Sequence, residues 1–216
     1  VLPGARLAVE GIDLPLEELK AKGYLEAKRG LLLERADASF GEGRIHAEGL
    51  LGAEGLRPRN LRFLVELRDI RYEWPKQVTY EFDGDGIITG TVDQPEVRGE
   101  MRLKNFRYTR RTNWKTMIFD YLKRRPREVQ SAAPRGGVFV DVSLRGDQDL
   151  KIENNLADLS LSVDLRARGY LSRTALFGRV EIPEGTVRFR TQEYDAMRSA
   201  IEFLGETQPV PLLDVH

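Results

Sequence analysis

Alternation of apolar and polar residues is the dominant pattern along this chain. Between Leu159 and Arg168 every odd position is apolar and every even position is polar. Successive side chains of a strand point to opposite faces of its sheet, so this period of two is typical of strands with one apolar and one polar face. Shorter runs of the same pattern lie at residues 61–67, 78–82, 101–103, 138–144, 180–182 and 187–189. The chain is therefore predicted to be all-β from about residue 5 to about residue 205.

Three segments rich in Gly, Asn, Asp or Pro are predicted to be turns between strands. They lie at residues 83–86, 153–155 and 183–185. The last of them, Pro183-Glu184-Gly185, predicts a hairpin between residues 180–182 and 187–189.

Two stretches of the chain repeat one pattern. Gly90 and Gly99 are nine residues apart, and so are Gly169 and Gly178. In both stretches an apolar residue stands two positions before the second glycine, and alternation resumes after it. The repeat predicts that one strand–turn–strand unit is used twice.

Two segments depart from the strand pattern. Residues 16–28 are rich in Leu, Glu, Lys and Ala, which indicates a short helix weakened by Gly23. Residues 113–123 carry one apolar stripe of helical spacing, made of Trp114, Met117, Ile118, Tyr121 and Leu122. This amphipathic helix belongs to an expected insertion at about residues 112–136, and it either plugs an open end of the sheet or lies on a membrane or partner.

The number of strands limits the architecture. Roughly fourteen candidate strands are too many for one flat sheet, because sheets beyond about ten strands curl, split or flatten. The apolar face is then either a packed sandwich core or the lining of a trough. A long exposed apolar lining requires a ligand, and an acyl chain is the natural one.

Composition excludes several classes of protein. The 34 basic and 34 acidic residues give a net charge of zero, which argues against a nucleic-acid binder. The chain has no cysteine, so it has no disulfide and no thiolate metal site. No apolar run approaches the length of a membrane span. Because it begins at Val1 without a signal peptide, the chain is interpreted as a segment of a longer protein.

The neutral total hides a basic stretch between Arg102 and Arg127. Ten basic residues and one acidic residue, Asp120, leave this stretch at plus nine. It is either a solvated basic face whose charge is neutralised by acidic neighbours, or a site for anionic partners such as phospholipid headgroups. The candidate patch for headgroups or a partner consists of Arg107, Arg110, Arg111, Lys115, Lys123, Arg124, Arg125 and Arg127.

No catalytic or metal-binding constellation is found in the sequence. The two histidines are His46, within an alternating segment typical of a surface strand, and His216 at the last position. Asp83 and Asp85 begin like a calcium loop, but Ile88 stands where that loop needs glycine. The protein is therefore predicted not to be an enzyme and to use no cofactor or metal.

The last third of the chain resembles the TamB family. The resemblance rests on Leu171-Ser-Arg-Thr-Ala-Leu-Phe-Gly178-Arg-Val180, on Gly185-Thr-Val-Arg-Phe189 and on residues 199–203 and 211–215. Thr174 stands where family members usually have proline, and Pro95 holds that place in the earlier repeat. The resemblance is strongest over residues 137–216.

The resemblance implies a fold, a location and a function. TamB-like proteins are periplasmic, anchored to the inner membrane, and form a long β-taco with a hydrophobic concave face. They are linked to outer-membrane protein assembly through a barrel partner of the TamA type, and to phospholipid transport between the two membranes as AsmA-like bridge proteins. This chain is accordingly expected to be one elongated β-rich domain over residues 1–216, an open trough without the anchor, and to bind phospholipid acyl chains.

The alternating apolar residues then become the expected lining of a lipid groove. They are Phe63, Val65, Leu67, Val78, Tyr80, Phe82, Met101, Leu103, Val140, Val142, Leu144, Leu159, Leu161, Val163, Leu165, Val180, Ile182, Val187, Phe189, Ile201 and Phe203. The alternative is a protein-binding scaffold with a packed core, whose strand edges pair with incoming β-barrel or autotransporter precursors by β-augmentation.

Overall fold

The chain folds as one open, curled sheet. The computed structural model describes residues 5–7, 16–26, 30–54, 57–111, 137–147, 149–189, 191–196, 198–205 and 212–214. The first strands are β1 (Ala5–Leu7), β2 (Leu16–Glu26), β3 (Gly30–Phe40), β4 (Gly43–Glu54), β5 (Arg57–Glu73), β6 (Val78–Thr91), β7 (Pro95–Tyr108) and β8 (Phe139–Gly146). They are followed by β9 (Leu150–Glu153), β10 (Ala157–Ser160), β11 (Ser162–Tyr170), β12 (Arg173–Ile182), β13 (Gly185–Phe189), β14 (Gln192–Asp195), β15 (Ser199–Leu204) and β16 (Leu212–Asp214). The all-β prediction is confirmed.

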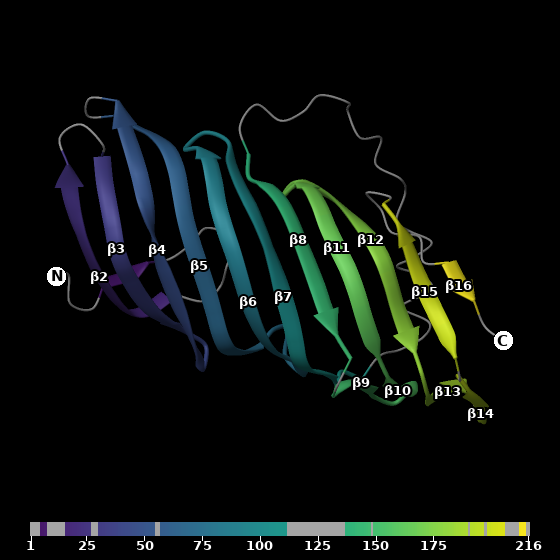
Figure 1. Cartoon of the computed structure of the whole chain (residues 1–216). Coiled ribbons are helices and arrows are strands. Elements are labelled where there is room, and N and C mark those ends of the chain that lie inside the picture. Colours follow the sequence, from purple (N-terminus) through teal and green to yellow (C-terminus); the bar gives the residue numbers. More distant parts are fainter. Residues whose placement is uncertain are drawn as a thin grey trace.

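The sheet forks at β7 (Figure 1). Strands β1 to β7 form an antiparallel meander, and β8 then pairs in parallel with the first half of β7 through residues such as Val97 and Val140. The main branch continues through β11, β12 and β15 to β16. A second branch begins where Phe106, near the end of β7, pairs with Leu150 of β9, and it continues through β10 and β13 to β14. In Figure 1 this short branch lies along the lower edge of the sheet.

The helix predicted at residues 16–28 is wrong. Residues 16–26 form β2, in which Gly23 pairs with Leu33 and Tyr24 with Leu32 of β3. Backbone pairing with a neighbouring strand overrides the weak helical preference of this composition. The amphipathic helix expected at residues 113–123 lies outside the described residues, and the described residues form no helix.

Two of the three predicted turns are also wrong. Residues 83–86 lie in the middle of β6, where glycines and aspartates alternate as the two faces of a strand. Residues 183–184 do not close a hairpin, because β12 pairs with β11 and β15 whereas β13 pairs with β10 and β14. The chain instead passes there from one branch of the fork to the other. The turn at residues 153–155 is confirmed: the Asn154 side chain accepts hydrogen bonds from the N–H groups of Leu156 and Ala157.

The repeated glycine pattern is confirmed as two equivalent hairpins. Gly90 of β6 pairs with Pro95 of β7, and Gly169 of β11 pairs with Thr174 of β12. The glycines nine residues later pair back in the same way, Gly99 with Gly86 and Gly178 with Leu165. Gly90 and Gly169 have φ of 96° and 136°, a region that glycine enters without the penalty of a Cβ.

Two adjacent β-bulges bend the middle of the sheet. One shifts the register of β5 between Leu67 and Ile70, and the other shifts β7 opposite Glu81 and Phe82 of β6. The Lys104 Nζ joins them, lying 2.8 Å from the Asp69 Oδ1 and 2.6 Å from the Asp83 Oδ2. Because bulges bend a strand and increase its twist, this ion cluster stabilises the curl of the sheet.

Buried side chains are few among the described residues, and most of them lie near the fork. Ile70 and Leu150 are 0% and 2% exposed. Ala157 and Leu159 of β10 form a hydrophobic cluster with Ile182 of β12, so the two branches pack against each other. The dry core therefore occupies one end of the strands.

Truncation of this core is expected to destabilise the fold. Leu150→Ala should lower the free energy of unfolding by about 2–5 kcal/mol, because it leaves a cavity among buried side chains. Leu171→Ala, in a turn where the side chain is 67% exposed, is the matched control and should change it by less than about 0.5 kcal/mol. Urea unfolding of both variants measures the difference, and equal losses would contradict a core located at the fork.

Candidate functional site

One face of the sheet is apolar from β2 to β15. Cross-strand partners point to the same face, so the registers can be followed from strand to strand. One such row runs through Ile45, Leu67, Gly84, Met101, Leu144, Leu165, Gly178 and Phe203. A parallel row four residues away runs through Leu33, Gly49, Phe63, Ile88, Val97, Val140, Gly169 and Thr174. We call this surface the apolar face and the opposite surface the polar face.

No second layer of described residues covers most of the apolar face. Along β5, the positions Leu61, Phe63, Val65 and Leu67 are half-buried, whereas the residues between them are exposed. The side chains of a packed sandwich core would be almost fully buried, as Leu150 is. The apolar face is thus sheltered by the curl of the sheet but remains open.

A row of mostly small residues, which we call the channel, runs along the middle of the apolar face between these two rows. Six of its nine members are Gly or Ala, and the row consists of Ala21, Ala36, Ala47, Val65, Gly86, Gly99, Val142, Ala167 and Leu176. Gly86 and Gly99 face each other directly, where a Cβ on Gly99 would lie 3.0 Å from the Gly86 Cα. A hollow of about 140 Å³ opens at this point, and Val65, Met101 and Val142 contribute to its lining.

The residues proposed from the sequence as a lining all lie on this apolar face or its continuation in the short branch. Val78, Leu103, Leu159 and Ile182 are buried. Val187 and Phe189 of β13 are exposed. The half-buried members are Phe63, Val65, Leu67, Tyr80, Phe82, Met101, Val140, Val142, Leu144, Leu161, Val163, Leu165, Val180, Ile201 and Phe203. The sequence reasoning missed the small residues between them, whose signal is the same period of two with Gly or Ala at the apolar positions.

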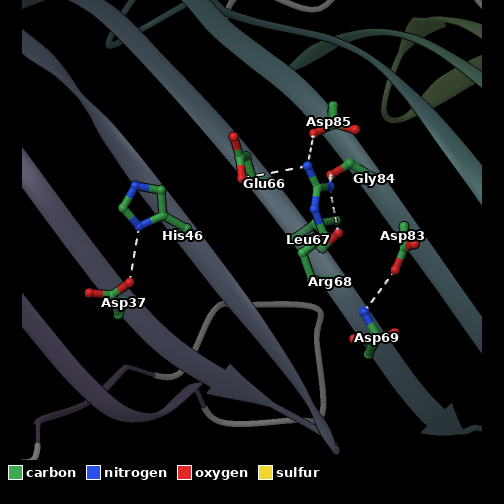
Figure 2. A network of polar contacts seen from close by, with 9 residues as sticks. All are labelled: Asp37, His46, Glu66, Leu67, Arg68, Asp69, Asp83, Gly84 and Asp85. Atoms are coloured by element: carbon green, nitrogen blue, oxygen red, sulfur yellow. Dashed lines mark hydrogen bonds and ion pairs between the residues drawn. The ribbon is translucent and has the colours of Figure 1, made fainter.

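The polar face carries a network of cross-strand ion pairs, part of which Figure 2 shows. The Arg68 Nη2 lies 2.6 Å from the Asp85 Oδ1 on β6, and Arg68 Nη1 donates to the Gly84 carbonyl at 3.0 Å. On β11, Arg166 binds both carboxylate oxygens of Asp141 on β8, at 2.6 and 2.8 Å. Opposite charges on facing strands favour this register over one shifted by a residue.

His46 belongs to the same network of polar contacts. Its Nδ1 lies 3.0 Å from the Asp37 Oδ1 on β3, and Arg35 donates to the same carboxylate at 2.6 Å. The Arg35 hydrogen bond is the largest cause that lowers the pKa of Asp37 below its ordinary value. No described group of three or more His, Cys, Asp or Glu residues is arranged to hold a metal ion.

The basic patch is only partly described. Arg107 lies on β7 with its Nε 3.4 Å from the Glu153 Oε2 of β9, and Arg110 and Arg111 are exposed just beyond the strand. Lys115, Lys123, Arg124, Arg125 and Arg127 lie outside the described residues. Within the described ranges, no helix is long and apolar enough to cross a membrane.

One comparison with known proteins gives a match. The model of a protein family described as the TamB C-terminal domain matches residues 34–216. No curated protein and no solved structure matches the chain. The matched region extends from β3 to the end of the chain and includes the fork and both glycine hairpins.

The ion cluster at the bulges predicts a dependence of stability on pH. Partial burial raises the pKa of Asp83, but the Lys104 ammonium and the Asp69 N–H outweigh it and hold that pKa below its ordinary value. A carboxyl with a lowered pKa in the folded state stabilises the fold above its unfolded pKa of about 3.9, and this contribution disappears as the pH falls through the folded pKa.

Asp83→Asn should therefore lower the free energy of unfolding most at about pH 6, and the difference from wild type should shrink below about pH 4. Urea unfolding across this range measures it. In a Lys104→Met background the same substitution should cost less, because the cation is gone. A difference that is constant with pH would show that the cluster contributes nothing through its charge.

Proposed function

Because the chain belongs to the TamB family, we propose that it is a non-catalytic periplasmic segment that holds phospholipid acyl chains on its apolar face during transport between the inner and outer membranes. The family consists of non-enzymatic bridge proteins involved in outer-membrane assembly and lipid transport. The proposal assigns this chain the lipid-binding part of that task.

The open apolar face is the observation that carries the proposal. Its side chains are half-buried along β5, and a hollow lies over Val65, Met101 and Val142. Contiguous apolar surface of this extent on a soluble protein usually marks a binding site. A long, flexible hydrocarbon is the ligand that matches a surface which is long, apolar and almost free of hydrogen-bonding groups.

The rows of the apolar face suggest the path of the acyl chain. Cross-strand rows run perpendicular to the strands and thus along the length of the trough. The channel of small residues, from Ala47 past Gly86 and Gly99 to Ala167, lies between two rows of larger side chains. An acyl chain laid in this channel would contact the larger side chains on both sides.

The finer elements of the proposal come from the family. Membership of the family suggests an anchor in the inner membrane and a barrel of the TamA type as the outer-membrane partner. The basic residues between Arg107 and Arg127 attract anionic headgroups.

A second function class is a scaffold that binds precursors of outer-membrane proteins by β-augmentation. One observation favours it: all four residues of β14 are exposed, and within the described chain β14 pairs only with β13. A free strand edge of this kind can accept a further strand. Proline in β14 would disable such a scaffold and leave lipid binding intact.

A charge placed on the apolar face tests the lipid-binding proposal. Val65→Asp puts a carboxylate into the channel and is expected to reduce co-purified phospholipid about tenfold or more, because an unpaired charge against acyl chains costs well over 1.4 kcal/mol. Leu64→Asp is the matched control, since Leu64 is the next residue of β5 and is 49% exposed on the polar face. Native mass spectrometry with lipid extraction measures the bound lipid, and circular dichroism verifies the fold.

Equal retention of lipid by the two variants would contradict the proposed groove. A wild-type segment that carries no lipid and takes up none on addition would contradict lipid binding altogether, and the scaffold function would then be the better explanation.

A further inference from the structure

An aromatic row crosses the apolar face at the end of the strands nearest the fork. Tyr72 of β5 pairs with Tyr80 of β6, and Tyr80 pairs with Phe106 of β7. The ring centroids of Tyr80 and Phe106 are 5.5 Å apart, and Phe40 of β3 extends the row with its ring 5.8 Å from that of Tyr72. All four side chains are half-buried, while Ile70 beside them is fully buried. The row therefore forms a continuous wall along one side of the trough.

Two hydroxyl groups in this wall have no hydrogen-bond partner within the part of the chain that the structure describes. Among the described residues, no group hydrogen-bonds to the hydroxyl of Tyr72 or Tyr80. Partial burial raises the pKa of Tyr80, and the neighbouring Tyr72 adds to the rise, so this hydroxyl remains a donor at neutral pH. Half-buried donors of this kind normally find an acceptor, because leaving them unpaired costs free energy.

The corresponding row toward the opposite end of β4 to β7 carries no tyrosine. The row of the apolar face at that end consists of Leu51, Leu61, Gly90 and Pro95. None of these side chains can form a hydrogen bond. Within β4 to β7, the tyrosine hydroxyls therefore lie on the side of the apolar face nearest the fork, next to hydrophobic residues such as Ile70 and Phe82.

We propose that Tyr72 and Tyr80 donate hydrogen bonds to the glycerol ester or phosphate oxygens of a phospholipid whose acyl chains lie in the channel. This inference rests on the proposed function and adds an orientation to it. The headgroups lie along the aromatic wall, and the row from Leu51 to Pro95 contacts the hydrocarbon. Tyrosines occupy the same position at membrane interfaces, where the ring is in apolar surroundings and the hydroxyl meets headgroups.

The test compares two double variants of the whole segment. Tyr72→Phe with Tyr80→Phe removes both hydroxyls of the wall and keeps the rings. Tyr24→Phe with Tyr170→Phe removes two hydroxyls from the polar face, where Tyr24 pairs with Leu32 and Tyr170 with Phe139. Affinities are measured by fluorescence with a pyrene-labelled phosphatidylglycerol, a pyrene-labelled fatty acid and a pyrene-labelled alkane.

The wall variant is expected to bind the phospholipid about fivefold or more weakly than wild type, because it loses two neutral hydrogen bonds. Its affinity for the alkane should be unchanged, and the control variant should match wild type for all probes. Loss of alkane affinity in the wall variant, loss for the fatty acid alone, or unchanged phospholipid affinity would each overturn the inference. Wild type that binds none of the probes would refute the proposed function itself, and with it the orientation.

Discussion

Backbone pairing between neighbouring strands is the interaction on which the rest of this structure depends. No described residues form a second layer over most of the apolar face, so the ladder of hydrogen bonds and the cross-strand side-chain pairs hold the described strands together. The bulges around Asp69 and Lys104 then convert a flat ladder into a curled one. A curled single layer shelters its apolar side without filling it, which is the physical condition for a protein that carries hydrocarbon along its length.

The fork at β7 provides a buried core, which a single-layer sheet lacks. A sheet with one open apolar face has few places to build a dry core, and here the core lies between the two branches, around Leu159 and Ile182. The buried core and the open part of the apolar face are therefore separated along the strands. The end nearest the fork is packed, and the middle, around Gly86 and Gly99, stays accessible. On the polar face, pairs such as Arg166 with Asp141 favour the register on which this division depends.

Much of this fold could be predicted from the sequence, because alternation directly reports which face each side chain joins. It assigned Val65, Val142 and Val163 to one face and identified the two glycine hairpins. It failed where Gly and Asp were interpreted as turn residues: at residues 83–86 they alternate within β6, and the glycines leave room on the apolar face. The pairing partner of β13 also could not be predicted, because long-range contacts decide that it pairs with β10 and not with β12. The aromatic wall was missed because Phe40, Tyr72 and Phe106 are far apart in sequence and meet only through the register of the sheet.

The equal registers of the two glycine hairpins have a consequence for the size of such proteins. Gly90 with Pro95 and Gly169 with Thr174 show that one two-strand unit can be inserted twice without turning any side chain to the other face. Each unit adds two strand spacings, about 10 Å, to the long axis of the trough. The length of a chain built in this way changes in steps of one hairpin. Mutations that add or delete a whole hairpin therefore change the length of the trough and leave its apolar lining continuous.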